Sequence, residues 1–143
     1  DYSEKLESFP ACYLYENAKG QRFMVYTFAP TYVKTKSEWH NGIFRNYYRQ
    51  KQLINGYEWL CGKPLPAVCE KHPHLYILCK REGEKLHIGL FNLSKDKIKN
   101  PEVTADKAYT ELDCFNCKGE INGRKIRLDT VLQPYSALFF TVK

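Results

Sequence analysis

Short apolar runs separated by polar turn residues divide most of the chain into segments typical of β-strands. Near the N-terminus, residues 12–15 and 23–28 are two such runs, and residues 17–20 between them contain the Asn and Gly of a hairpin loop. The second run is apolar on both faces, so we expect a strand in the centre of a sheet. The pattern therefore predicts an N-terminal β-hairpin.

One segment repeats its apolar residues with a helical period instead. Between residues 38 and 61, large apolar side chains fall on one stripe. Thr35 and Glu38 have the spacing of a capping box at a helix N-terminus, and Gly62 and Pro64 are typical of a C-terminus. We predict a long amphipathic helix over residues 38–61.

Beyond residue 66 the apolar residues recur with period two. The Asn122–Gly123 dipeptide is a strong hairpin signal, and Glu82, Gly83 and Glu84 mark a second turn. The predicted strands are residues 74–80, 86–93, 103–105, 109–115, 125–129 and 136–142. Short strands separated by turns at this spacing are typical of an antiparallel sandwich.

These elements together predict a mainly β (α+β) fold, an antiparallel β-sandwich with one long amphipathic helix packed against it. Residues 1–66 are expected to hold the hairpin and the helix, and residues 67–143 the sandwich. At 143 residues, the chain has the length of about one domain, and we expect one compact unit.

The distribution of charged and apolar residues argues against two classes of partner, nucleic acids and membranes. The net charge is +6, from 22 Lys and Arg against 16 Asp and Glu, but the basic residues are interspersed with acids. A nucleic-acid interface needs clustered cations, so no nucleic-acid partner is expected. No apolar stretch approaches the roughly 20 residues needed to cross a bilayer, so no membrane partner is expected either.

Six cysteines, at positions 12, 61, 69, 79, 114 and 117, fall partly inside apolar runs. We expect reduced, mostly buried thiols and a cytoplasmic location, with secretion as the alternative. Cys114 and Cys117 form a CxxC pair, but a structural zinc site needs a second ligand pair at suitable spacing. No metal site and no cofactor are therefore predicted.

Motifs for catalysis are absent from the sequence. There is no GxSxG nucleophile elbow, no HExxH and no phosphate-binding glycine loop. The acidic residues lie on the predicted helix or at turns, where solvation explains them. No catalytic residue is assigned and no enzymatic activity is expected, although a small thiol- or carboxylate-based hydrolase remains an alternative.

Aromatic residues make up 15 % of the chain and are its remaining chemical signal. Sugar-binding sites stack the apolar face of a sugar ring on exposed aromatic side chains. Tyr32, Trp39 and Tyr48 lie in or near the predicted helix and are candidate carbohydrate-binding residues; the alternative is that these rings pack between helix and sheet. Trp59 is expected in the core.

Two stretches resemble known families. Residues 20–26, the predicted helix and the Trp-Leu-x-Gly-x-x-Leu-Pro segment at residues 59–66 resemble the closing portion of glutamine-amidotransferase-like domains in bacterial glycosidase-type proteins. The Asn-x-Ser-x-Asp pattern at residues 92–96 and the Leu-x-Pro-Tyr-Ser pattern at residues 132–136 are similar to those in C-terminal β-sandwich domains of glycoside hydrolases.

The resemblance implies a non-catalytic C-terminal accessory domain of a bacterial, glycosidase-like, carbohydrate-active protein. Its role would be interdomain packing or oligomerisation, and its partner an upstream catalytic domain or a second copy of the chain. The alternative is an independent carbohydrate-binding module that uses exposed aromatic residues. Because the matching segments include no catalytic residue, none is carried over.

Overall fold

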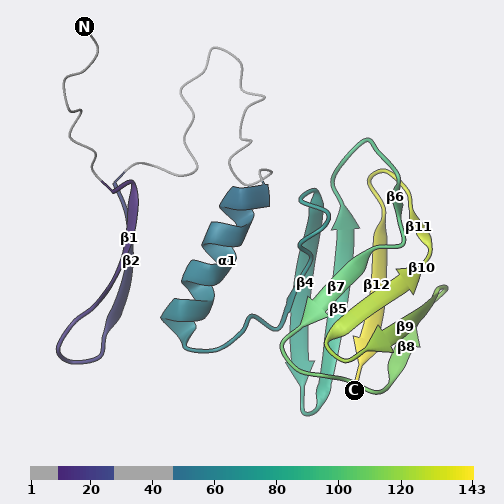
Figure 1. Ribbon diagram of the computed structural model, residues 1–143. Coiled ribbons are helices and arrows are strands. Elements are labelled where there is room, and N and C mark those ends of the chain that lie inside the picture. Colours follow the sequence, from purple (N-terminus) through teal and green to yellow (C-terminus); the bar gives the residue numbers. More distant parts are fainter. Residues whose placement is uncertain (1–9, 28–46) are drawn as a thin grey trace, which may run out of the picture.

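The computed structural model describes residues 10–27 and 47–143 (Figure 1). An N-terminal hairpin and a helix precede ten further strands. In chain order the elements are β1 (Cys12–Glu16), β2 (Arg22–Tyr26), α1 (Tyr47–Cys61), β3 (Ala67–Val68), β4 (Leu75–Glu82), β5 (Lys85–Asn92), β6 (Ile98–Lys99), β7 (Glu102–Ala105), β8 (Leu112–Cys114), β9 (Lys118–Asn122), β10 (Lys125–Asp129), β11 (Val131–Leu132) and β12 (Ala137–Val142).

Two four-stranded antiparallel sheets form the sandwich. One has the strand order β4-β5-β12-β8 and the other β3-β7-β10-β9, while β11-β6 and β1-β2 are separate two-stranded pairs. In Figure 1, β7 and β10 cross in front of β5 and β12. The predicted mainly β (α+β) fold is confirmed. The predicted division of the chain at residue 66 stays a prediction.

Period-two patterning explains how the two sheets share one core. Along β5, Leu86, Ile88 and Leu90 are buried on one face, and the side chains between them lie on the other. Both sheets contribute to a single cluster of buried residues. Its largest fully buried aliphatic members are Leu86, Ile88, Leu90, Val103, Ile126, Leu128 and Val142.

The N-terminal hairpin forms as predicted, with Asn17 and a positive-φ Gly20 in its loop. The prediction that its second strand is central to a sheet is wrong, because within the described residues β2 pairs with β1 alone. Phe23 in β2 remains 44 % exposed. An apolar pattern on both faces shows that a strand is suited to burial on both sides. It does not determine which other strands pair with it.

Helix α1 ends at Cys61, as the sequence predicts, and the positive φ of Gly62 turns the chain away. Residues 38–46, the first part of the predicted helix, lie outside the described residues. The described part contacts β2, where Met24 lies against Gly56. It also contacts the sandwich, because the Gln50 amide donates to the Pro73 carbonyl at 2.7 Å.

Trp59 lies at the contact between the hairpin and the helix rather than in the core, which corrects the sequence-based expectation. It is only partly buried. The Arg22 guanidinium stacks 5.3 Å from the centre of its indole ring and donates to the Trp59 carbonyl at 2.8 Å. A large apolar residue in a helix need not face the main core when a second element covers it.

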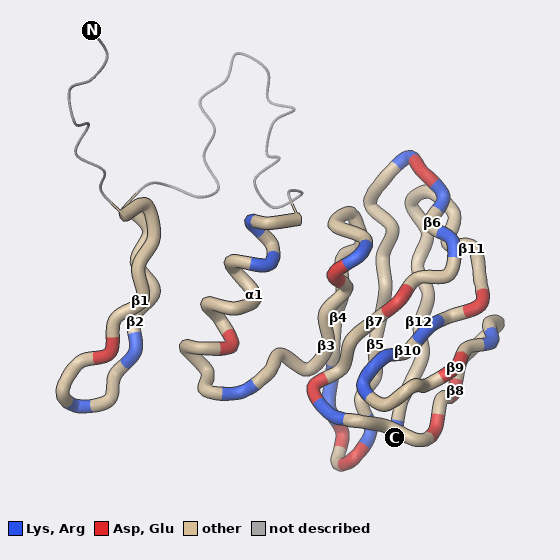
Figure 2. Tube along the Cα trace, in the orientation of Figure 1, with Lys and Arg blue, Asp and Glu red and all other residues tan. Residues whose placement is uncertain are grey.

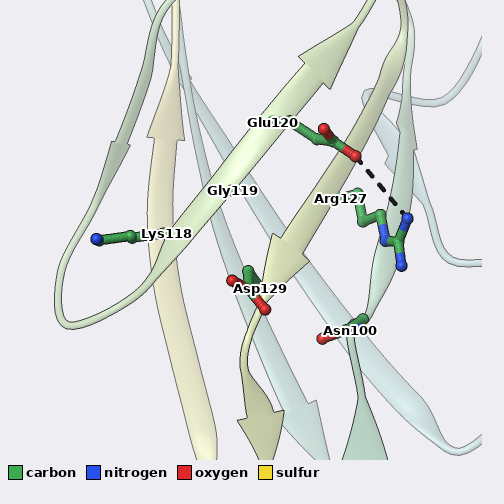
Figure 3. Close-up of a pocket in the computed structure, with 6 residues that line it drawn as sticks. All are labelled: Asn100, Lys118, Gly119, Glu120, Arg127 and Asp129. Atoms are coloured by element: carbon green, nitrogen blue, oxygen red, sulfur yellow. Dashed lines mark ion pairs between the residues drawn. The ribbon is translucent and has the colours of Figure 1, made fainter.

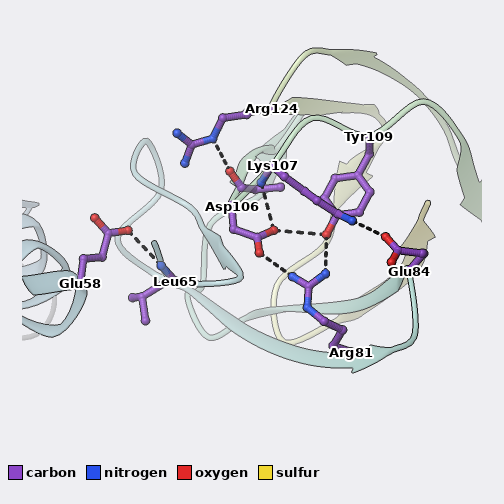
Figure 4. Close-up of polar contacts among 9 residues, drawn as sticks. Glu58, Leu65, Arg81, Glu84, Asp106, Lys107, Tyr109 and Arg124 are labelled. Atoms are coloured by element: carbon purple, nitrogen blue, oxygen red, sulfur yellow. Dashed lines mark hydrogen bonds and ion pairs between the residues drawn. The ribbon is translucent and has the colours of Figure 1, made fainter. Parts of the chain in front are cut away.

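A polar network joins the two sheets at one end of the sandwich (Figure 4). Arg81 of β4 donates to the Asp106 carboxylate at 2.6 Å and to the Tyr109 hydroxyl at 3.0 Å. The Tyr109 hydroxyl donates in turn to Asp106 at 3.2 Å. Lys107 lies over the Tyr109 ring and forms an ion pair with Glu84 at 2.5 Å. Since Tyr109 is 4 % exposed, the network anchors a buried ring as well as two charges.

Asn92, the last residue of β5, anchors the end of the sandwich opposite to this network. Its side chain is completely buried, and its amide donates to the carbonyls of Asp96 and Gln133 at 2.7 Å and 3.0 Å. Its Oδ1 accepts from the backbone N–H and the hydroxyl of Ser94 at 3.0 Å and 2.8 Å. The Asn-x-Ser-x-Asp pattern therefore forms a hydrogen-bonded bend that ties β5 to the segment before β12.

The cysteines differ from the sequence-based expectation. Cys114 and Cys117 are joined by a disulfide, so the chain is not fully reduced. Of the four free cysteines, only Cys69 is buried; Cys61 and Cys79 are exposed and Cys12 is partly buried. The expectation of reduced, mostly buried thiols is wrong because the turn between β8 and β9 brings two cysteines together, and Cys61 lies on the exposed side of its helix.

Candidate binding face

The outer surface of the sheet β4-β5-β12-β8 carries a mixed group of aromatic, aliphatic and charged side chains. Residues on this surface alternate with the core residues of the same strands. Because the strands pair antiparallel in a defined register, the outward residues align in rows that run across the sheet.

One row is polar and crosses all four strands. Lys80 of β4 pairs with His87 of β5, His87 with Thr141 of β12, and Thr141 with Asp113 of β8. His87 Nδ1 lies 2.9 Å from the Thr141 hydroxyl, and His87 Nε2 lies 3.3 Å from the Glu82 carboxylate. The two ends of the row, Lys80 and Asp113, have opposite charge.

The neighbouring rows are apolar. Leu78 pairs with Gly89, and Gly89 with Phe139. In the next row Tyr76 pairs with Phe91. The Phe91 and Phe139 rings meet edge to face with their centroids 5.6 Å apart, a favourable aromatic geometry. Tyr76, Leu78 and Phe139 are 53 %, 50 % and 58 % exposed, so this apolar surface is open to solvent.

Gly89 allows the two phenylalanine rings to lie close to the sheet. A methyl group at this position would stand 3.0 Å from the Phe139 ring and 3.1 Å from the Phe91 ring. A side chain here would therefore require the rings to shift by a few tenths of an ångström. Glycine favours this close packing for steric reasons, since its backbone is not in the positive-φ region.

The polar row and the first apolar row together line a shallow hollow of about 650 Å³. Phe115 completes its wall from the turn between β8 and β9 and is 79 % exposed. The Cys114–Cys117 disulfide closes the turn that carries this ring. The site thus takes side chains from four strands and one covalently closed turn.

The outer surface of the opposite sheet is charged. Figure 2 shows basic and acidic segments alternating along β9 and β10. A second hollow, of about 330 Å³, lies over these strands and is lined mainly by charged side chains (Figure 3). Glu120 and Arg127 point toward one another there at 3.9 Å, but both side chains are more than half exposed. An exposed ion pair of this kind contributes little to stability and is typical of a solvated surface.

The residues predicted to bind carbohydrate do not form this site. Tyr48 lies on α1, is 77 % exposed and meets Tyr47 edge to face at 5.3 Å. Tyr32 and Trp39 lie outside the described residues. The sequence did contain a signal for the outer face: the C-terminal strand is apolar on both sides, which leaves Phe139 facing outward.

Two of the free cysteines, Cys69 and Cys79, have thiols that are unfavourable as nucleophiles. Burial raises the pKa of Cys69 to about 11. The Cys79 residue is exposed overall, but partial desolvation of its thiol, helped by the nearby Asp106 carboxylate, raises its pKa to about 11 as well. Both thiols are therefore protonated near neutral pH. Within residues 10–27 and 47–143, no three His, Cys, Asp or Glu side chains gather to hold a metal ion. In the same part of the chain, no helix has the length and apolar character of a membrane span.

No family model, curated protein or solved structure matches this chain.

Proposed function

We propose that this chain is a non-catalytic accessory β-sandwich domain of a glycosidase-like, carbohydrate-active protein, and that its N-terminal hairpin packs against an adjoining catalytic domain or a second copy. The observation that carries the packing role is the hairpin's exposed apolar surface. Tyr13, Leu14, Tyr15 and Phe23 are between 44 % and 53 % exposed.

These side chains lie on both faces of the hairpin. Tyr15 pairs with Phe23 on one face, where their ring centroids are 6.0 Å apart, and Leu14 lies on the other. An isolated two-stranded hairpin is marginally stable in water, and exposed apolar patches often mark interaction surfaces. The glycosidase-like part of the proposal rests on the sequence resemblance alone.

Two measurements on the protein test the packing role. In the first, the complete reading frame that encodes this chain is expressed, and the proteolysis of the hairpin is measured. In the second, the oligomeric state of the chain itself is measured by sedimentation. We expect either an adjoining catalytic domain that protects the hairpin from proteolysis or a dimer of the chain. Tyr15→Ser should remove that protection or dissociate the dimer, and Tyr48→Ser, on the exposed side of α1, should not.

A reading frame without a catalytic domain, combined with a monomeric chain at high concentration, would overturn the packing role. The proposal that the domain is non-catalytic is tested by a separate assay. Hydrolysis of chromogenic glycosides by the chain, abolished by substitution of a single carboxylate, would contradict it.

A further inference from the structure

We infer that the hollow on the outer face of β4-β5-β12-β8 binds a sugar ring. The ring's apolar C–H face would lie over Phe139 and Leu78, and its hydroxyl groups would meet the polar row that ends in Lys80 and Asp113. This site is separate from the hairpin, so either proposal can fail while the other stands.

The dimensions of the hollow suit a small ligand. Ligand pockets commonly have volumes of about 300–1,000 Å³ and combine mainly apolar walls with a few polar groups. This hollow measures about 650 Å³ and has that composition. It is shallow and open, which fits a ligand that keeps part of its surface in water.

The apolar row supplies a stacking surface. Phe139 is more than half exposed, and its ring is held edge to face by Phe91. Gly89 has no side chain, so both rings can lie close to the sheet beside it. Phe115 adds a second aromatic wall on the side of β8. A ring with one apolar face can contact these groups without burying an unpaired polar atom.

The polar row supplies both kinds of hydrogen-bonding group. Lys80 can donate three hydrogen bonds and the Asp113 carboxylate can only accept, whereas each sugar hydroxyl can do both. Thr141 and His87 are already paired at 2.9 Å and form a fixed centre to the row. Within the described residues, Lys80 and Asp113 have no side-chain hydrogen bond or ion pair, so both remain available to a ligand.

The same row disfavours other occupants. An apolar protein surface placed over the whole hollow would bury Lys80 and Asp113 without partners, which is costly for charged groups. An anionic ligand would meet the Asp113 and Glu82 carboxylates as well as Lys80. A neutral polyhydroxylated ring satisfies the donor and acceptor ends of the row together.

The test is a titration of the folded chain, followed by backbone amide shifts in NMR spectra. The probes are D-glucose, D-galactose, D-mannose, D-xylose and N-acetyl-D-glucosamine, each also as its methyl glycoside. We expect saturable shifts for at least one probe, concentrated in β5 and β12. Phe139→Ala should weaken this binding about five- to tenfold, as expected for the loss of a stacked aromatic contact.

Asp113→Asn provides a second variant, since this exposed side chain makes no packing contribution to the core and the variant should fold normally. It should weaken binding by at least about fivefold, through loss of a charge-assisted hydrogen bond. Tyr48→Ala removes an exposed aromatic ring elsewhere on the chain and should leave the affinity unchanged.

Absence of saturable shifts with every probe overturns the inference. Saturable binding that persists unchanged in both Phe139→Ala and Asp113→Asn also overturns it. A dimer that Phe139→Ala dissociates, without sugar-induced shifts, would instead assign this face to a second copy of the chain. None of these outcomes depends on the hairpin.

Discussion

Replacement of Asn92 by alanine should cost the sandwich a large part of its stability. The Asn92 side chain has no exposed surface. It donates to the carbonyls of Asp96 and Gln133 and accepts two hydrogen bonds from Ser94. Asn92→Ala removes these four contacts and a longer one, from the Asn92 amide to the Leu132 carbonyl at 3.4 Å, and leaves their partners in the protein.

The magnitude follows from the number of contacts. A typical hydrogen bond contributes about 1 kcal/mol net, and a buried polar group left unsatisfied costs about 1–3 kcal/mol. Asp96 is an exposed residue, so we expect water to replace part of the lost hydrogen bonding at its carbonyl. We therefore expect Asn92→Ala to lower the free energy of unfolding by about 3 kcal/mol, a substantial part of the roughly 5–15 kcal/mol of a small domain.

Urea unfolding followed by circular dichroism measures this loss. Ser94→Ala removes the hydroxyl that donates to Asn92 Oδ1 at 2.8 Å and makes two longer contacts, of 3.2 Å each, with the Asp96 backbone, and it should cost about 1 kcal/mol. Asn55→Ala, on the exposed side of α1, should change stability by less than about 0.5 kcal/mol. A loss below about 1 kcal/mol for Asn92→Ala would refute the assignment of this bend as a structural anchor.

Asn92→Asp separates hydrogen-bonding chemistry from shape. The new carboxylate keeps the acceptor for Ser94 but faces the Asp96 and Gln133 carbonyls without a donor. Burial raises its pKa in the folded state, so the variant should be most stable at low pH. Stability should fall as the pH rises above about 3.9, the value for an unfolded chain, and through the folded-state pKa. Wild-type stability of Asn92→Asp at pH 7 would contradict this account.

Three further outcomes are expected. Asp106→Ala removes the carboxylate that links the two sheets and should lower the unfolding free energy by about 1–2 kcal/mol in urea titrations; no change would show that the network in Figure 4 is not structural. The Lys71 ammonium lies 2.9 Å from the Glu102 carboxylate and lowers the pKa of Glu102. The stability that this ion pair contributes is therefore complete above the unfolded-state pKa of about 4.3. It is lost as the pH falls through the folded-state pKa. Lys71→Met should therefore reduce stability at pH 7 by at most about 1 kcal/mol and have less effect at pH 3, and the opposite dependence would exclude this pairing. Alkylation of the folded chain at pH 8, followed by mass spectrometry, should modify exposed Cys61 well before Cys69, whose pKa burial raises to about 11; equal rates would contradict the buried position of Cys69.

Local sequence pattern accounts for most of the secondary structure. Residues 125–129 alternate between apolar and polar, and β10 indeed buries Ile126 and Leu128. The hairpins formed where turn residues interrupted apolar runs, because a tight turn depends on a few adjacent residues. Helix α1 ended at the predicted residue for the same reason: Gly62 adopts the positive φ that stops a helix.

The same local reasoning failed where burial depends on distant segments. Phe23 and Phe139 both lie in strands that are apolar on two faces. The sequence indicated that β2 would be central, but β12 occupies a central position and β2 does not. The difference lies in which strands pair, and strand pairing joins residues that are far apart in the chain.

The sequence by itself determined the mainly β composition, the turns and which side of most strands faces the core, since these follow from the order of neighbouring residues. Only the tertiary structure decided that Lys80, His87, Thr141 and Asp113 form one row beside Phe139. A one-residue change of register would move each of these side chains to the opposite face. The candidate site is therefore a product of long-range register, which no short motif in the sequence records.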